Sequence, residues 1–212
     1  MPPPLYPRVM SAKKLPLWLK VAYTVWMLVW VPAYAWHHGP QNFLWLCDIC
    51  NLILLVAIWR ESSLLFSSQL LAVFIPSLLW SFDVAWTAVT GVHPIGGTDY
   101  MFDPAIPLYI RLISLFHVVV PALLLWCVWR LGFDRRGLAL QCLITAVLLP
   151  ATYLLTDPEL NINWVHGLFG EPQRVVHPWI YVAACILCYP LVLYLPTHGL
   201  CLLLFGRRPG NE

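Results

Sequence analysis

The chain has 212 residues, a formal net charge of +2, 12 tryptophans and a composition that is 60% hydrophobic and only 10% charged. Soluble globular domains carry about 25% charged residues, so this balance excludes an ordinary soluble domain and indicates an integral membrane protein. The lysines and arginines form no extended basic patch, so nucleic-acid binding is not expected.

Six apolar segments fit transmembrane helices of about 20 residues each. In chain order they cover residues 16–36, 42–59, 64–90, 105–131, 137–155 and 177–205. The first segment follows Lys13 and Lys14, as a secretory signal would, but its apolar run is longer than a signal core. The sequence therefore predicts an all-α protein, a single domain over residues 1–212 with six transmembrane helices.

Charged residues between these segments alternate between two sides of the predicted membrane. One side carries Arg8, Lys13, Lys14, Lys20, Arg60, Arg130, Arg135, Arg136, Arg207 and Arg208. The other side carries Asp99, Asp103, Asp157, Glu159 and Glu171 against the single Arg174. Because positive residues stay on the cytoplasmic side, both termini are predicted to be cytoplasmic and the two long loops, 91–104 and 156–176, to face outward.

Polar and ionisable side chains inside membrane segments are costly and are therefore candidates for function. The outer halves of the second, third and fourth segments hold seven candidates: Cys47, Asp48, Asn51, Asp83, Arg111, Ser114 and His117. At 1.5 Å per residue they lie roughly 8 to 18 Å below the outer surface. Isolated charges in hydrocarbon cost several kcal/mol each, so we expect the charged members to meet in a pocket or pairing network.

Three interpretations of this cluster are open. Arg111 with Asp48 or Asp83 can be a structural ion pair that fixes helix packing. Cys47 can be a nucleophile with His117 as its general base, with an aspartate orienting the imidazole. Finally, the cluster can line a lipid pocket in a scaffold or accessory protein that does no chemistry.

Metal and redox sites are weaker alternatives. Two C-x-x-C pairs occur, Cys47 with Cys50 and Cys185 with Cys188, but they lie within predicted helices without the glycine turns of a zinc knuckle. Free thiols packed as small hydrophobic groups are the default for all seven cysteines, since each falls in an apolar segment. The outer loops also hold a scattered set that could bind a cation: His93, Asp99, Asp103, His166 and His177.

Two short motifs give a resemblance to known membrane enzymes. FLWLCD, residues 43–48, resembles the PLHLCS-like stretch of YwaF-type bacterial membrane proteins and their eukaryotic transmembrane acyltransferase relatives, in which the cysteine is the nucleophile. HVVVP, residues 117–121, is similar to the fourth-span motif of the androgen-induced family of fatty-acid-ester hydrolases. Trp45 and Asp48 replace a histidine and a serine of the first pattern, and the hydrolases use a threonine nucleophile. The resemblance therefore carries over only to Cys47 and His117.

Longer stretches resemble a group of bacterial membrane-associated proteins. They are Asn42–Asp48, Thr98–Pro104, Ile113–His117, Phe133–Arg136 and Asn161–Trp164, and they are spread over most of the chain. This resemblance implies a multi-pass protein of a bacterial cytoplasmic membrane, and it implies no particular activity.

The sequence thus predicts a protein that transfers or hydrolyses a fatty acyl group on a membrane lipid. Cys47 is expected to attack the ester carbonyl while His117 removes its proton. Arg111 is expected to hold a lipid phosphate, a carboxylate or the developing oxyanion. Asp48, Asn51, Asp83 and Ser114 are the expected substrate-binding or electrostatic residues. No cofactor is required, and membrane lipid is the only expected partner. A non-catalytic lipid-binding protein and a metal or redox site remain the alternatives.

Overall fold

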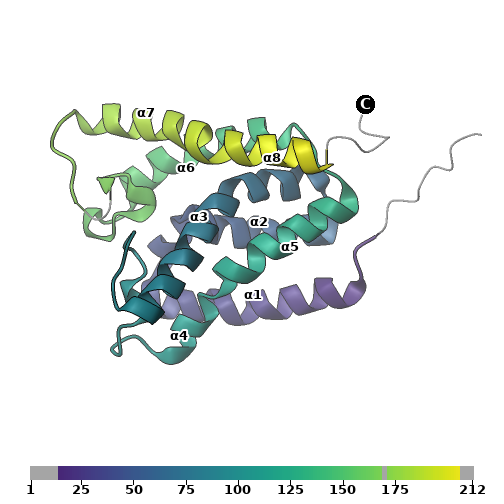
Figure 1. Cartoon of the computed structure of the whole chain (residues 1–212), viewed down its shortest axis with the longest axis horizontal. Helices are drawn as coiled ribbons and strands as arrows, with labels where there is room; N and C mark the ends of the chain where they lie inside the picture. The colour runs from purple at the N-terminus through teal and green to yellow at the C-terminus, as the bar shows by residue number, and fades with distance from the viewer. Residues whose placement is uncertain (1–13, 169–170, 206–212) are drawn as a thin grey trace, which may run out of the picture.

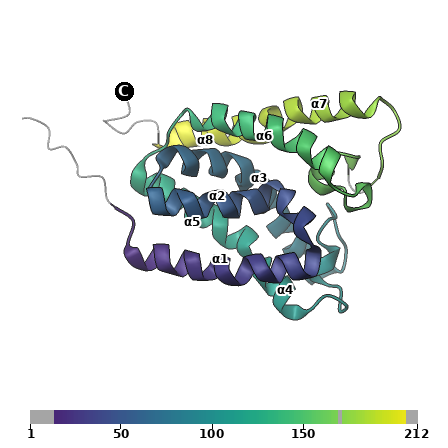
Figure 2. The same ribbon diagram turned by 180° about the vertical axis from the view of Figure 1, so that it is seen from behind.

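A computed structural model of the chain describes residues 14–168 and 171–205, and every regular element within them is helical. The α-helices are α1 (Leu17–His38), α2 (Leu46–Arg60), α3 (Ser63–Thr90), α4 (Leu108–Ile113), α5 (Phe116–Leu131), α6 (Gly137–Leu155), α7 (Pro178–Tyr189) and α8 (Leu195–Phe205). Short 3-10 helices are η1 (Pro40–Leu44), η2 (Asp99–Met101), η3 (Pro158–Leu160) and η4 (Ile162–Trp164), and η6 (Pro190–Tyr194) is a π-helical turn. Figures 1 and 2 show these helices packed side by side, so the predicted all-α class is confirmed.

Five helical stretches are long and apolar enough to cross a membrane, which indicates a membrane protein. They are Leu17–His38, Ser63–Thr90, Leu108–Leu131, Gly137–Leu155 and Pro178–Phe205. The second predicted segment is different, because α2 has only 15 residues. At 1.5 Å per residue it is roughly 22 Å long, short of a hydrocarbon core of about 30 Å. Five of the six expected segments are therefore long and apolar enough to cross a membrane.

Two of the predicted segments contain interruptions that hydropathy does not reveal. The fourth divides into α4 and α5 at Ser114 and Leu115. The sixth continues from α7 to α8 through the π-helical turn that begins at Pro190. Proline has no backbone N–H, so its hydrogen bond is lost and the helix adjusts locally at that point.

Helix α3 lies at the centre of the bundle and packs against α2, α5 and α6. It begins at Ser62, whose hydroxyl accepts a hydrogen bond from the Leu65 N–H, and it ends at Gly91 in the left-handed conformation. Every residue from 66 to 73 is buried, so this half of the helix is covered on all sides. A helix that is buried all round lies in the centre of a bundle, and α3 provides the core on which the other helices pack.

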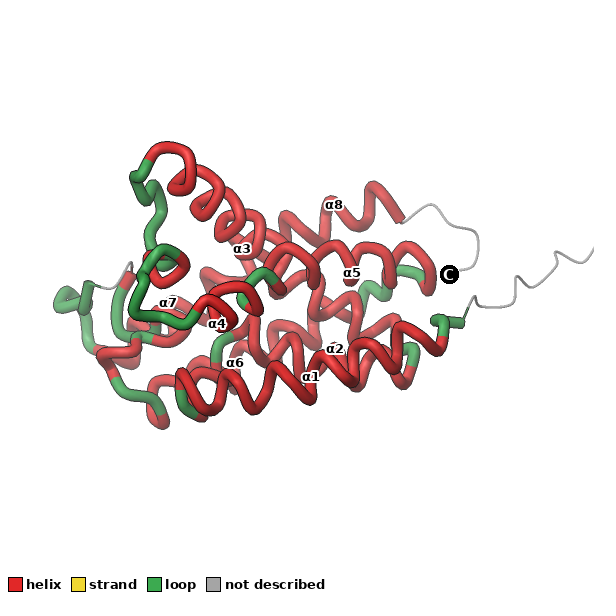
Figure 3. The backbone as a smooth tube through the Cα atoms, turned by 90° about the horizontal axis from the view of Figure 1, so that it is seen from below, coloured by secondary structure: helices red, strands yellow, loops and turns green. Residues whose placement is uncertain are grey.

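The loops sort into two groups at opposite ends of the bundle (Figure 3). At one end the Arg130 guanidinium donates to the Lys14 carbonyl, and Lys20 pairs with Glu61 at 2.5 Å. We call this the basic end. At the other end, the loop end, lie residues 91–107, 156–168 and 171–177, and Asn163 among them hydrogen-bonds to the start of α2. Lys14, Lys20 and Arg130, which were predicted to lie on one side of the membrane, thus lie at one end of the molecule.

Helices α3 and α6 approach closely near the basic end, where polar side chains hydrogen-bond inside the bundle. The Ser68 hydroxyl donates to Gln141 Oε1 at 2.9 Å, and Gln69 Nε2 donates to the same oxygen at 3.3 Å. A Cβ on Gly137 would lie 2.8 Å from both the Ser67 Cβ and the Ser68 backbone nitrogen. Glycine is therefore required at the start of α6 so that the two backbones can approach.

Gly137→Ala is expected to destabilise the protein, because the added methyl group would push α6 away from α3. The expected cost is about 1–3 kcal/mol, the range for overpacking a well-packed contact. Gly199→Ala is the matched control, since nothing lies within 4 Å of a Cβ built there on helix α8. Thermal unfolding of both variants in one detergent should give a lower midpoint for Gly137→Ala only, and equal midpoints would contradict the close approach.

Candidate functional site

The seven residues expected to form one cluster all lie toward the loop end, where they belong to separate polar networks. Asp83 pairs with the loop that follows α3. Cys47, Asp48 and Asn51 form a second network in the first turns of α2. Ser114 and His117 form a third at the junction of α4 and α5, and Arg111 contacts the outer loop.

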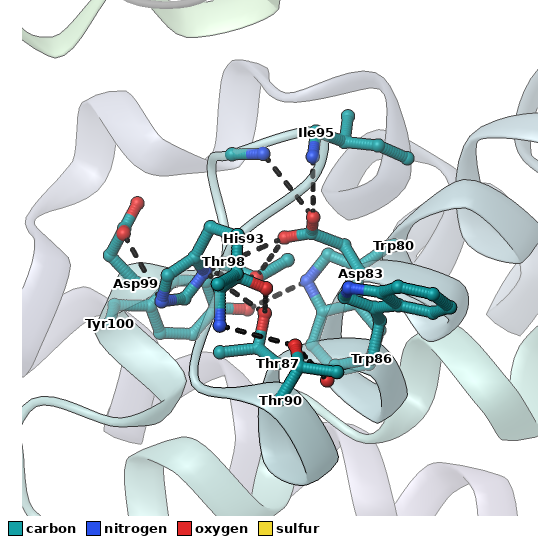
Figure 4. A network of polar contacts seen from close by, with 12 residues as sticks. Trp80, Asp83, Trp86, Thr87, Thr90, His93, Ile95, Thr98, Asp99 and Tyr100 are labelled. Carbon is teal, nitrogen blue, oxygen red and sulfur yellow. Dashed lines mark hydrogen bonds and ion pairs between the residues drawn. The ribbon is translucent and has the colours of Figure 1, made fainter.

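Asp83 holds the loop after α3 in place (Figure 4). Its carboxylate accepts hydrogen bonds from the backbone N–H groups of Ile95 at 2.7 Å and Gly96 at 3.3 Å, and from the Thr98 hydroxyl. The His93 Nδ1 lies 3.8 Å from the same carboxylate. Asp83 itself is fully buried. All of its partners come from its own loop, so its evident role is to fix that loop over the end of α3.

The outer-loop residues considered for a metal site do not gather around one point. His93 Nε2 lies 3.4 Å from Asp99, whose side chain is 73% exposed, and Asp103 caps the following turn by accepting from the Ala105 N–H. No group of three or more His, Cys, Asp or Glu side chains suited to a metal occurs within residues 14–168 and 171–205. All seven cysteines are free thiols.

Asp48 is buried at the start of α2, and none of the cations within residues 14–168 and 171–205 pairs with it. Its carboxyl accepts a 2.6 Å hydrogen bond from the Asn42 amide, and the Cys47 thiol lies 3.8 Å from its other oxygen. The Asn51 amide donates to the Cys47 carbonyl, and the Tyr23 hydroxyl donates to Asn51 Oδ1. A buried carboxyl of this kind is stabilised either by a nearby positive charge or by binding a proton.

Asn163 organises the start of α2 from far along the chain, although it is not among the site residues predicted from the sequence. Its side-chain oxygen accepts from the Leu46 N–H at 2.9 Å, and its amide donates to the Leu44 carbonyl at 2.7 Å. The same amide donates to the Thr152 hydroxyl, while the Tyr189 hydroxyl donates to the Asn163 carbonyl. Asn163 therefore joins η1 and α2 to α6 and α7, and fixes the turn that carries Cys47 and Asp48.

Ser114 is the centre of the third network, at the break between α4 and α5. Its hydroxyl lies 2.6 Å from the Tyr34 hydroxyl and donates to the Ile110 carbonyl. The Ser114 side chain also interacts with the Tyr100 phenol, which accepts a hydrogen bond from Trp80 Nε1. Three hydroxyl groups from α1, the outer loop and the α4–α5 junction therefore meet at one buried point.

His117 is held in a defined orientation beside this point. Its Nδ1 lies 2.9 Å from the Ser114 carbonyl oxygen. A carbonyl can only accept, so Nδ1 carries the proton and Nε2 keeps its lone pair. The ring stacks on Trp80 at 4.6 Å and on Phe116 at 4.1 Å between centroids. Within the described part of the chain no hydrogen bond to Nε2 is formed, so the lone pair of this nitrogen is left without a donor.

Cys47 and His117 come from different networks, and no direct hydrogen bond joins their described side chains. Tyr100 lies close to both networks: burial raises the pKa of its phenol to about 12, and the neighbouring Cys47 and Asp48 add to that rise. The Tyr100 hydroxyl is thus a proton donor that stays neutral at physiological pH. Trp80 connects Tyr100 to His117, because its Nε1 donates to the Tyr100 hydroxyl and its ring stacks on the imidazole.

Arg111 does not pair with either aspartate. Its Nη1 donates to the Met101 carbonyl at 3.2 Å, while its buried Nε has no hydrogen-bond partner. The ion pairs found within residues 14–168 and 171–205 leave out both Arg111 and Asp48. The expected ion-pair network is therefore absent from the described residues, and the positive charge of Arg111 is not neutralised by a carboxylate.

Comparison with other proteins identifies no relative. The chain matches no protein family, no curated protein and no solved structure. Its function is therefore inferred from the chemistry of its own residues.

Asp83→Ala is expected to release the outer loop, because it removes the acceptor for two backbone N–H groups and one hydroxyl. Each buried N–H left unpaired costs about 1–3 kcal/mol. Hydrogen exchange should show the Ile95 and Gly96 amides losing at least tenfold protection. Asp99→Ala is the control, since Asp99 is exposed and contacts only His93 in this network. Unchanged exchange at both amides in Asp83→Ala would rule out the proposed anchoring of the loop.

Proposed function

We propose that the chain is a six-span protein of a bacterial cytoplasmic membrane with both termini in the cytoplasm. Two observations support the sixth crossing. The 3-10 helix η1 adds roughly 10 Å to α2 at 2.0 Å per residue, which brings their combined length close to a hydrocarbon core. The Lys20–Glu61 ion pair places the end of α2 beside the start of α1, so α2 runs back along α1. The basic end then faces the cytoplasm.

We further propose that the loop end transfers or hydrolyses a fatty acyl group of a membrane lipid. The observation that carries this proposal is the orientation of His117, whose Nδ1 is held by the Ser114 carbonyl so that Nε2 is an available base. A thiol becomes a useful nucleophile only beside such a base or a cation. A lipid reaches this depth with its chains still in hydrocarbon, which explains why such a site belongs in an apolar bundle.

The reaction takes two steps. The sulfur of Cys47 attacks the ester carbonyl as its proton passes to His117 Nε2. The carbonyl re-forms, the lipid hydroxyl leaves with that proton, and the acyl group stays on sulfur as a thioester. Water or the hydroxyl of a second lipid then attacks the thioester, gives a proton back to sulfur through His117, and frees the acyl group. Arg111, which has no carboxylate partner, binds a lipid phosphate or the developing oxyanion.

A non-catalytic lipid-binding protein is the second candidate, and one observation favours it. The Cys47 thiol is near the Asp48 carboxyl, and His117 is packed between two aromatic rings, with no direct hydrogen bond from one to the other. In that case the polar groups serve helix packing and lipid binding, and the thiol is inert.

His117→Phe separates these candidates, because phenylalanine keeps the ring stack but has no basic nitrogen. An acyl electrophile with a lipid-like chain should label Cys47 in the parent protein. The labelling rate should fall by about 100-fold in His117→Phe, the scale of general-base assistance. Intact-protein mass spectrometry over time measures this rate.

Two further variants control the labelling. Cys47→Ser should abolish labelling of the peptide that contains residue 47, whereas Cys188→Ser should leave the labelling of that peptide unchanged, because Cys188 lies on α7 outside this network. Equal labelling rates for the parent and His117→Phe would contradict the role of His117 as base. A Cys47 that stays unlabelled while lipid remains bound would favour the non-catalytic candidate.

A further inference from the structure

Helices α1 and α5 enclose an apolar groove on the membrane-facing side of the bundle. The groove has a volume of about 570 Å³. It is lined by Trp18, Leu19, Val118, Val119, Ala122, Leu123 and Trp126. Figure 1 shows α5 diverging from α1 toward the end where α1 begins, and the groove lies between these two helices.

Contacts at both ends of the two helices define the limits of the groove. Toward the loop end, Trp30 packs edge-on against Phe116 with ring centroids 5.7 Å apart. At the basic end, Arg130 Nε and Nη2 donate to the Lys14 carbonyl at 3.1 and 2.9 Å. Between them the exposed Ala122 contributes only a methyl group. The groove is therefore enclosed at its two ends and open sideways toward lipid.

Positive charge is concentrated at one end of this groove. The Arg130 guanidinium lies 5.4 Å from the centre of the Trp126 ring, which lines the groove. Arg130 donates only to a backbone carbonyl, and the Lys14 side chain is exposed. Neither residue takes part in an ion pair within the described part of the chain. An anion at this end would find two cations without carboxylate partners.

The length of the groove fits the chain of a lipid in one leaflet. From Val118 to Trp126 helix α5 rises roughly 12 Å at 1.5 Å per residue. Half of a hydrocarbon core of about 30 Å is similar in length. The tryptophans at the charged end suit the boundary between lipid chains and headgroups.

We propose that this groove binds an anionic glycerophospholipid, with one acyl chain along Ala122 and the phosphate at Arg130 and Lys14. The charged end of the groove lies about 20 Å along α5 from His117 at 1.5 Å per residue, so the ester of this lipid is not the one proposed to react at Cys47. The lipid fills the groove between α1 and α5. The proposal requires only the membrane setting and is independent of the reaction at Cys47.

Native mass spectrometry of the delipidated full-length protein titrated with phosphatidylglycerol tests the groove. Ala122→Trp fills it and should weaken the tightest phosphatidylglycerol binding step by at least tenfold. Ala146→Trp is the matched control, since Ala146 is also exposed on a membrane helix but does not line the groove. It should bind like the parent. Equal affinities for the two tryptophan variants would overturn the proposal.

Titration with phosphatidylcholine in parallel tests the headgroup. The parent and Arg130→Lys, which keeps the charge, should bind phosphatidylglycerol several-fold more tightly than phosphatidylcholine. Arg130→Gln should lose this preference, and a preference that persists would overturn the phosphate site. If Arg130→Gln does not fold, the comparison of Ala122→Trp with Ala146→Trp still decides. These titrations do not involve Cys47, so a failure here leaves the acyl-transfer proposal untouched, and the reverse holds too.

Discussion

The side chain of Asn163 makes the interaction on which the loop end depends. Inside a bundle of apolar helices no bulk water is available, so the polar groups at the start of α2 must find partners within the protein. Asn163 supplies them for the Leu46 N–H and the Leu44 carbonyl, and connects both to Thr152 on α6. A residue more than 100 positions along the chain thus fixes the first turn of α2, and with it the positions of Cys47 and Asp48.

The fold was predictable where hydropathy decides it and unpredictable where backbone hydrogen bonding decides it. The all-α class and five of the expected segments follow from apolar runs that only helices can bury in lipid. The short α2 did not follow, because residues 42–44 were counted in the second apolar segment yet belong to the 3-10 helix η1. Nor did the break at Ser114, where a side chain hydrogen-bonds to the preceding turn and no proline or glycine marks the position.

The location of the candidate site was predictable from the sequence, but the residues that pair with one another there were less so. Counting polar residues within the apolar segments pointed to one end of the bundle, and that is where Asp48, Asp83 and His117 lie. It also suggested that the aspartates would neutralise Arg111, whereas Asp83 binds backbone N–H groups of the outer loop. Loop amides are present in every sequence, so no residue pattern reveals that they will fold back onto a particular carboxylate. Tyr100 and Asn163 were missed because both lie in loops, outside the segments in which polar residues were counted.

We propose that one apolar bundle combines two roles, acyl chemistry at the loop end and lipid binding toward the basic end. In the proposed reaction Cys47 carries the acyl group between two lipids or between a lipid and water. This reaction is tested by mass analysis of the peptide containing Cys47 after incubation of the protein with a phospholipid that has deuterated acyl chains. A deuterated acyl adduct on Cys47 that hydroxylamine removes is expected. Release of fatty acid at the same rate from a Cys47→Ser protein, without any such adduct in the parent, would contradict it.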